Sequence, residues 1–180
     1  MASACSAEGW TEEERGIILN QGEVMRILTI EAEEDSIILR RQSKDLSAKE
    51  LNDDIFRLLS EKMISTLSST DGGVGIAGPQ VGISRRIVAV QRFDKEGLPI
   101  EVYPNIRIIA KRGEKIPGRE GCLSVPDCWG NVPRHQEIDI SYTAMSEGRD
   151  TTETILDFTA VIFQHECDHL DGVLYTDLTL

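Results

Sequence analysis

The stretch VIFQHECDHLDG, residues 161–172, decides the fold because it predicts a helix with two histidines on one face. His165 and His169 are four positions apart, and residues i and i+4 of an α-helix lie one turn apart on the same side. Their imidazoles can therefore point at one metal ion. Glu166 can reach a water molecule on that ion, as in the H-E-x-x-H motif of metal-dependent hydrolases. The alternative is an amphipathic helix with incidental histidines, yet two of the chain's three histidines stand here.

The helix is expected to run over roughly residues 158–171. Phe158, Val161 and Ile162 give it an apolar approach, and Gly172 is typical of the residue that ends a helix. Cys167 stands two residues from each histidine, about 200° around the helix, so it should face away from the ion. We expect it to fill a small space in the core.

Several strands precede this helix. Residues 86–93 (RIVAVQRF) have a strand pattern, and residues 100–113 (IEVYPNIRIIAKRG) form one or two more strands, with Pro104 at an edge or a break. In residues 137–144, Ile138, Ile140 and Tyr142 alternate with polar residues, so one face of that strand is buried. Residues 145–150 are expected to turn, and residues 151–158 to form a strand that leads into the helix.

A further helix pattern lies within residues 47–73. Ser47 and Glu50 have the spacing of a capping box, and a helical stripe of apolar residues follows until Asp-Gly-Gly at 71–73 stops it. The order of helix, strands and helix predicts an α+β fold. We expect mainly antiparallel sheets packed around a C-terminal metal-binding H-E-x-x-H helix, plus one N-terminal amphipathic helix.

Length and composition fit one globular domain. The chain has 180 residues, 40% of them hydrophobic and 28% charged, and no apolar run long enough to span a membrane. Its net charge of −12 argues against a nucleic-acid-binding surface. Four cysteines without paired spacing indicate free thiols in a reducing compartment. We expect the polar, acidic residues 1–24 to be a flexible extension and residues 25–180 to form the catalytic domain.

A catalytic metal site needs a third protein ligand and keeps one position open. A lone histidine at a strand start, such as His135, is more often a surface residue, and Asp171 is too close to His169 on the same helix. A glycine precedes Cys122 in an extended segment, where the backbone can approach a partner, but a buried structural cysteine would look the same. The residues alone leave the choice open among Cys122, Cys128, His135, Asp171 and Asp177.

The glycine-rich stretch GGVGIAGPQVG, residues 72–82, has the glycine density of a phosphate-binding loop. It follows a helix and precedes a strand, however, and it lacks the lysine and hydroxyl of a P-loop. The glycines would instead let backbone groups approach an extended substrate. Gln80 follows a proline that fixes the backbone, and its amide could stabilise an oxyanion. A plain turn with a solvent-facing glutamine fits this loop equally well.

Taken together, three segments resemble the peptide deformylase family. They are GVGIAGPQ (73–80), EGCLS (120–124) and QHECDHL (164–170). The family's pattern is G-x-G-x-A-A-P-Q, E-G-C-x-S and Q-H-E-x-D-H, in that order and at similar separations. The resemblance extends over roughly residues 25–178 and implies that Cys122 is the third metal ligand beside His165 and His169.

The resemblance also implies the chemistry. A divalent ion would lower the pKa of a water molecule, and Glu166 would take its proton before attack on the formyl carbon of an N-formylmethionyl peptide. The Leu123 backbone N–H and the Gln80 amide would stabilise the charge on the formyl oxygen. Glu166 would then protonate the departing amine, and formate would leave. Gly75 is expected to hydrogen-bond the substrate backbone, and the methionine pocket is expected to be lined by Phe158, Val161, Ile162 and His165.

Two residues depart from the family's pattern. Gly78 replaces the second alanine of the loop, which would add flexibility next to Gln80. Trp129 stands where many members carry a long polar or basic residue, so it would shape a different outer pocket. Neither change touches a predicted ligand or Glu166. The alternatives to a deformylase are a metallopeptidase, and a deformylase-like binding protein without turnover.

The expected cofactor is one divalent ion. The resemblance implies Fe²⁺ as the native metal, while a thiolate with two imidazoles also suits Zn²⁺, Ni²⁺ or Co²⁺. The expected partners are N-formylmethionyl nascent peptides, with the ribosome as a further candidate, and neither nucleic acid nor a membrane. We expect a cytoplasmic location. The alternatives are an organelle, or a lipoprotein trimmed near Cys5, because ASAC before Ser6 faintly resembles the end of a lipoprotein signal.

Overall fold

The computed structural model of the chain describes residues 9–145 and 148–180, and Cys5 lies outside these ranges. The helices are α1 (Glu12–Asn20), α2 (Glu33–Leu39), α3 (Ala48–Leu51), α4 (Asp54–Ser68) and α5 (Asp157–Leu170), with the short 3₁₀ helices η1 (Gly78–Val81) and η2 (Tyr175–Asp177). The strands are β1 (Gly75–Ala77), β2 (Ile87–Gln91), β3 (Ile100–Pro104), β4 (Arg107–Cys122), β5 (Val125–Ala144) and β6 (Arg149–Leu156).

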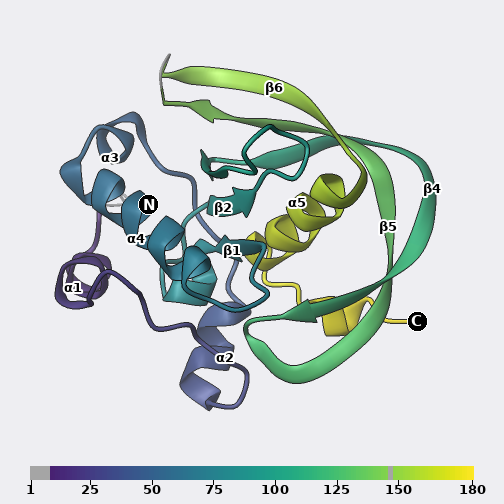
Figure 1. The fold of residues 1–180 in the computed structure, drawn as a ribbon. Coiled ribbons are helices and arrows are strands. Elements are labelled where there is room, and N and C mark those ends of the chain that lie inside the picture. The colour runs from purple at the N-terminus through teal and green to yellow at the C-terminus, as the bar shows by residue number, and fades with distance from the viewer. Residues whose placement is uncertain (1–8, 146–147) are drawn as a thin grey trace, which may run out of the picture.

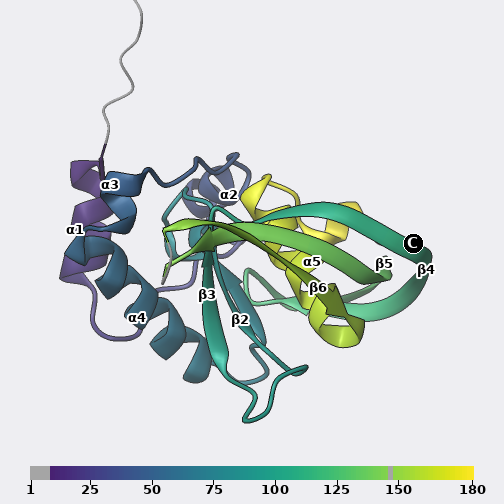
Figure 2. The ribbon, with the colours of Figure 1, turned by 90° about the horizontal axis from the view of Figure 1, so that it is seen from above.

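The strands form two antiparallel sheets, ordered β1–β2–β3 and β4–β5–β6. Helix α5 lies at the centre of the molecule, against the first sheet and enclosed by the second (Figure 1). Helix α4 covers the other face of the first sheet, and α1 and α3 pack against α4, as the view from above shows (Figure 2). The architecture is the predicted α+β fold with antiparallel sheets.

Alternation along β2 explains how one sheet serves two cores. Ile87 and Ala89 are buried in the core that contains α4, whereas Val88 and Val90 are buried in the core that contains α5. Successive side chains of a strand point to opposite faces, so a run of four apolar residues belongs to a strand covered on both sides. Cys167 is buried in the α5 core, as predicted from its place on the helix.

The predicted first helix is two helices. Ser47 and Glu50 form the expected capping box, but they begin only the short α3. The chain then leaves the helix, and the Asp53 side chain accepts a hydrogen bond from the Ile55 N–H to begin α4. An aspartate at this position competes for backbone donors and starts a new helix rather than continuing the old one.

The long strands β4 and β5 exceed the prediction for this region. The patterns at residues 107–113 and 137–144 mark only one end of each strand, and apart from the extended segment expected around Cys122 no pattern indicates the rest. Both strands bend through register shifts between Ile108 and Ala110, between Arg112 and Lys115, and between Glu120 and Cys122. Residues 111–119 are exposed, so they show no alternation of apolar and polar side chains. The expected turn at 145–150 joins β5 to β6, and residues 146–147 of it lie outside the described ranges.

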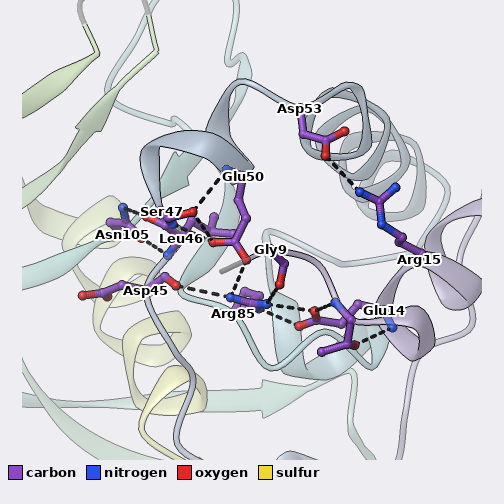
Figure 3. A network of polar contacts seen from close by, with 11 residues as sticks. Gly9, Glu14, Arg15, Asp45, Leu46, Ser47, Glu50, Asp53, Arg85 and Asn105 are labelled. Carbon is purple, nitrogen blue, oxygen red and sulfur yellow. Dashed lines mark hydrogen bonds and ion pairs between the residues drawn. The ribbon is translucent and has the colours of Figure 1, made fainter. Parts of the chain in front are cut away.

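The described part of the expected flexible extension is docked on the protein. Trp10 and Ile18 are 7% and 0% exposed and belong to the same core as α4. Arg85 joins the segment to the domain through Glu14 and the Gly9 carbonyl oxygen, and Figure 3 shows this network. In this structure residues 9–24 therefore pack on the domain, and the expected extension includes a docked helix. Only two buried apolar side chains anchor a mostly polar segment, which the sequence pattern did not reveal.

None of the helices in the described ranges is long and apolar enough to cross a membrane.

Candidate metal centre and active site

Three side chains that could bind a metal ion come together from two elements. His165 and His169 come from α5, and Cys122 comes from the end of β4. One ligand atom from each lies within 4.8 Å of the others, and Cys122 Sγ is 3.1 Å from His169 Nε2. Three donors leave a position open for water, which is the arrangement of a catalytic rather than a closed structural site.

The other candidates for the third ligand are engaged elsewhere or lie apart from the histidines. His135 Nδ1 lies 2.9 Å from the Gly113 carbonyl oxygen. Asp171 pairs with Arg86, and Asp177 pairs with Arg40. Cys128 is exposed and is not part of the cluster of possible ligands found among the described residues. The geometry therefore selects Cys122, the residue that the resemblance implied.

The backbone at Cys122 is set by a close approach. Cys122 pairs with Val125 across a two-residue turn that contains Leu123 and Ser124. The space where a side chain would begin at Gly121 is filled by the ring of Trp129, whose Cζ3 would lie 2.7 Å from an added Cβ. Glycine at this position therefore leaves room for the Trp129 ring against the backbone next to Cys122. The Trp129 side chain is 64% exposed and carries the Arg119 guanidinium on its ring, 4.8 Å from the centroid.

A buried ion pair that no sequence pattern indicated orients the His165 ring. His165 Nδ1 is 2.9 Å from Glu120 Oε2, and Arg134 binds both oxygens of Glu120 at 2.8 and 3.1 Å. A carboxylate only accepts, so Nδ1 carries the hydrogen and Nε2 faces the cluster as a potential ligand. Burial raises the pKa of Glu120, but the hydrogen bonds from His165 and Arg134 lower it overall. Glu120 therefore stays ionised. Its position within the EGCLS segment was the available signal.

Helix α5 also carries Asp168, which pairs with the same arginine. Arg134 Nη1 lies 2.5 Å from Asp168 Oδ2, so one guanidinium ties α5 to β4 and β5. The Tyr175 ring from η2 is stacked on His165 with centroids 6.1 Å apart. Burial lowers the pKa of His165, but hydrogen bonding to Cys122 and Glu120 raises it to about 10 overall. Burial lowers the pKa of His169. The pKa values of the two imidazoles are therefore shifted in opposite directions.

The Glu166 carboxylate is buried, and one of its oxygens lacks a hydrogen-bond partner in the described part of the chain. It is 3% exposed, and Oε2 has no hydrogen-bond partner among the described residues. Burial is the main cause that raises the pKa of Glu166, to about 7. A group with this pKa can both take and return a proton near neutral pH. Burial of such a carboxylate costs stability, and carboxylates of this kind are common at functional sites.

Gln80 is held by hydrogen bonds at both ends of its amide. Oε1 accepts from the Ala77 N–H at 2.9 Å, and Nε2 donates to Ser124 Oγ at 3.1 Å and lies 3.6 Å from Cys122 Sγ. The amide nitrogen is therefore aimed at the cluster. Gln80 is 1% exposed, which rules out the alternative of a solvent-facing glutamine.

A strap formed by residues 28–30 joins the two loops that flank the cluster. The Leu28 N–H donates to the Gln80 carbonyl oxygen at 2.8 Å, and the Ile30 N–H donates to the Ser124 carbonyl oxygen at 2.9 Å. Asp35, 2% exposed, holds the strap through the Thr29 N–H and Arg26. No sequence pattern indicates this contact, because backbone groups make it.

Gly78 has a packing role rather than the expected flexibility. A side chain there would begin 2.6 Å from the Ile83 carbonyl oxygen and 2.8 Å from the Arg85 carbonyl oxygen. Both carbonyls belong to a turn that folds back on η1. The residue that departs from the family's pattern therefore makes a tight backbone contact that keeps Gln80 in place.

A cavity of about 410 Å³ opens beside the cluster, between the edge strands of the two sheets. The Gln91 N–H donates to the Val74 carbonyl oxygen, so bonded pairs alternate and the Gly75 N–H and C=O point away from β2, toward the free edge of β1. His169 is 1% exposed and is not part of the wall. All other predicted site residues line the cavity: Gly75, Gln80, Cys122, Leu123, Phe158, Val161, Ile162, His165 and Glu166.

Comparison with known proteins places this geometry in context. A family model described as polypeptide deformylase matches residues 24–179. The chain is 39% identical over 142 residues to a peptide deformylase of Pseudothermotoga lettingae, covering 78% of this chain and 77% of that protein. It is 38% identical over 155 residues to peptide deformylase 2 of Clostridium acetobutylicum, covering 86% of this chain and 96% of that protein.

Solved structures agree with the sequence comparison. The crystal structure of peptide deformylase from Thermotoga maritima superposes with a TM-score of 0.76 at 31% identity, covering 87% of this chain and 98% of that one. A class I type b peptide deformylase from Acinetobacter baumannii, solved with Met-Ala-Ser bound, superposes with a TM-score of 0.76 at 34% identity, covering 86% and 98%.

Proposed function

The chain belongs to the polypeptide deformylase family, and we propose an assignment of that family's reaction to the residues of this site. It is an amidohydrolase that removes the formyl group from the amino terminus of newly made polypeptides. Water is consumed, formate leaves, and a free amine remains on the peptide. The observation that carries this assignment is the cluster of Cys122, His165 and His169 beside the buried Glu166.

Cys122, His165 and His169 would hold one divalent metal ion. Their donor atoms lie close enough together, and a thiolate with two imidazoles suits Fe²⁺, Zn²⁺, Ni²⁺ or Co²⁺. The unpartnered Oε2 of Glu166 beside these ligands supports a catalytic site with an open position. Fe²⁺ is the proposed native ion. When bound, a divalent ion of this kind acidifies water and polarises a carbonyl oxygen.

Glu166 moves the proton. Its carboxylate takes a proton from the attacking water and later delivers it to the amide nitrogen that becomes the free amine. Burial, which raises the pKa of Glu166 to about 7, suits a group that performs both transfers in one cycle. Glu120 supports the reaction indirectly, because it keeps the His165 ring turned so that Nε2 faces the cluster.

Gln80 and Leu123 stabilise the oxygen on which charge develops. The Gln80 amide nitrogen is fixed by the hydrogen bond that Oε1 accepts from Ala77, so little reorganisation is needed during the reaction. The Leu123 N–H is the second proposed donor, and Leu123 lines the cavity next to Cys122. The strap from Leu28 to Ile30 holds the two loops that carry these donors at a fixed separation.

The peptide binds as an added strand. Gly75 offers a free N–H and C=O on the edge of β1, and an extended peptide can pair with them. The methionine side chain enters the apolar wall formed by Phe158, Val161 and Ile162. Binding of Met-Ala-Ser to the related Acinetobacter baumannii enzyme supports a peptide that begins with methionine.

The test is formate release from formyl-Met-Ala-Ser. Protein prepared without oxygen is loaded separately with Fe²⁺, Ni²⁺ and Zn²⁺ and compared with Glu166→Ala. We expect turnover by the wild type and its loss in the variant, with the rates ranking the metals. Mass spectrometry of the product separates the alternatives: cleavage after methionine would indicate a metallopeptidase, and bound metal and peptide without any product would indicate a binding protein.

The substrate also defines the place of action. Polypeptides begin with formylmethionine only where translation starts with this residue. We therefore assign the chain to the cytoplasm of a bacterium, or to an organelle that starts translation with formylmethionine. The ribosome is the source of the nascent peptide and is the proposed macromolecular neighbour. A sedimentation assay of the chain with and without ribosomes tests this contact.

A further inference from the structure

A second cavity borders α5 on a different side from the catalytic cavity, and we call it the rear cavity. Its volume is about 440 Å³, and α5 contributes Cys167, Asp168 and Asp171 to its wall. The loop before α3, the residue before β2 and the first part of β4 form the rest of the wall. The two cavities share no lining residue in the described part of the chain, so the rear cavity is separate from the proposed site of reaction.

The carboxylates of the rear cavity are already neutralised by arginines. The three pairs are Asp45 with Arg107, Asp168 with Arg134, and Asp171 with Arg86. A carboxylate that is paired in this way attracts a cation less strongly than a free one does. The wall therefore does not present a free acidic cluster, although it contains three aspartates.

Lys111 is a lining residue whose charge is free. Its ammonium group has no hydrogen-bond or ion-pair partner within residues 9–145 and 148–180, and it acts on Asp168 only from beyond ion-pair distance. Arg41 and Lys44 flank the lining residues 42–43 in sequence. Both are exposed, and neither has a carboxylate partner in the same ranges. In a chain with a net charge of −12, these three free cations form a local surplus of positive charge, which attracts an anion.

Arg86 adds donors that are buried in the wall. It is 8% exposed, its Nε and Nη2 donate to the Ile106 carbonyl oxygen, and its Nη1 donates to Asp171. Each terminal nitrogen of a guanidinium carries two hydrogens, so Nη1 and Nη2 keep one N–H each. A guanidinium with N–H groups to spare is suited to the oxygens of a phosphate.

Ser43 supplies a hydroxyl that lacks a partner. The residue lines the rear cavity and is 6% exposed, and its Oγ makes no hydrogen bond in the described part of the chain. Its backbone N–H donates to the Leu170 carbonyl oxygen at 2.7 Å, which fixes the residue against the end of α5. Buried hydroxyls are nearly always hydrogen-bonded, so an unpaired one in the wall of a cavity points to a ligand.

We propose that the rear cavity binds the phosphate group of a small phosphorylated molecule. Lys111 supplies the opposite charge, and Arg86 and Ser43 donate hydrogen bonds to the phosphate oxygens. The volume of the rear cavity is typical of small-molecule sites and leaves room for the rest of the ligand. A nucleic acid fits less well, because a net charge of −12 repels a polyanion and only three free cations offset this repulsion.

The experiment measures the dissociation constant of inorganic phosphate for the nickel-loaded protein by isothermal titration calorimetry. The wild type should bind in the millimolar range, as expected for so small a ligand. Lys111→Ala should weaken binding roughly tenfold or more, and Ser43→Ala roughly three- to tenfold. Ser43→Ala removes only an unpartnered hydroxyl, so the variant should fold as the wild type does.

Lys115→Ala is the matched control. It removes another exposed lysine of β4 that has no carboxylate partner in the described ranges and does not line the rear cavity. The variant should keep the dissociation constant of the wild type. If Lys115→Ala weakens binding as much as Lys111→Ala does, phosphate responds to general charge and the proposal fails. It also fails if the wild type binds no phosphate, or if neither Lys111→Ala nor Ser43→Ala weakens binding.

Two further titrations separate the other sources of a phosphate signal. Met-Ala-Ser in excess should leave binding unchanged, and displacement by this peptide together with insensitivity to Lys111→Ala would place the phosphate in the catalytic cavity instead. Glycerol phosphate should bind at least as tightly as inorganic phosphate, because the rear cavity has room for its carbon chain. An oligouridylate that binds through Lys111 more tightly than glycerol phosphate would overturn the small-molecule assignment in favour of RNA.

Discussion

Gly75 lies against Glu166 so closely that a Cβ added to Gly75 would stand 2.8 Å from Glu166 Cδ. The contact joins the edge strand β1, where a peptide is proposed to bind, to the proposed proton carrier on α5. Because Glu166 is 3% exposed and its Oε2 has no partner in the described chain, little else holds its carboxylate. The lack of a side chain at Gly75 therefore leaves the space that the Glu166 carboxylate occupies. It also keeps the edge of β1 accessible.

We predict that Gly75→Ala removes most of the activity and leaves the fold intact. The new methyl group has to push the Glu166 carboxylate away, so kcat should fall by roughly 10²–10⁴-fold, the contribution typical of a positioned acid–base group. The measurement is formate release at saturating substrate, with metal content and circular dichroism recorded in parallel. Gly118→Ala is the control, because a side chain there meets open space. Wild-type kcat in Gly75→Ala would refute the positional role.

Glu120→Gln should weaken metal binding. The glutamine can keep a contact with His165 but carries no charge for the buried Arg134, whose guanidinium loses its bidentate partner. We expect metal affinity to fall by about 10–100-fold, as is usual for groups that orient a ligating histidine. Competition with a chromophoric chelator measures this change.

The control for that experiment is Glu114→Gln, which removes an exposed carboxylate from the same strand, β4. It should leave affinity unchanged. If both variants bind metal as tightly as the wild type, Glu120 does not control the orientation of His165. If both weaken equally, the effect is a general loss of negative charge rather than the loss of one hydrogen bond.

Elements with clear periodicity could be predicted from the sequence, whereas those shaped by tertiary contacts could not. The α5 pattern and the alternation at Ile138 and Ile140 reflect burial of one face, which the spacing of apolar residues reveals. Most of β4 is exposed on both faces, so nothing in its side chains distinguishes a strand from a loop. The docking of α1 depends on Trp10 and on a distant arginine, Arg85, which no local pattern connects.

The candidate site also contains residues that could be predicted from the sequence and residues that could not. The spacing of His165 and His169 on a helix fixes their common direction, so the pair was predictable from geometry. Cys122 was one of several possible ligands until the resemblance selected it, because its approach depends on the turn at Leu123 and Ser124. Arg134 could not be predicted, since its partners on β4 and α5 are brought together only by the curvature of the second sheet.

Gln80→Ala should lower the rate with little effect on the affinity for substrate. The amide donor acts mainly when charge develops on the formyl oxygen, so kcat should fall by about 10²–10³-fold, whereas KM should change little. Steady-state kinetics with formyl-Met-Ala-Ser measures both. Gln91→Ala, at the end of β2 and away from the cavity wall, is the control and should leave both constants unchanged. A rise in KM alone in Gln80→Ala would assign Gln80 to binding instead.

The Glu14–Arg85 pair should make the docking of α1 depend on pH. Burial raises the pKa of Glu14, but its bonds with Arg85 and Thr11 lower the value overall. A carboxylate with a depressed pKa in the folded state stabilises the fold above its unfolded value of about 4.3, and this stabilisation is lost as pH falls through the folded value. Glu14→Gln should therefore cost roughly 1.5–3 kcal/mol in the free energy of unfolding at pH 7 and less near pH 3.5.

Urea unfolding of the wild type and Glu14→Gln at both pH values tests this prediction. The exposed Glu12→Gln, on the same helix, should cost almost nothing at either pH. A gap between Glu14→Gln and the wild type that stays constant from pH 7 to 3.5 would contradict the ionic account, because a packing defect does not titrate. A difference in the free energy of unfolding that shrinks on acidification would show that the charge on Glu14 holds α1. Protonation of Glu14 in the wild type then removes the same charge that the substitution removes at neutral pH.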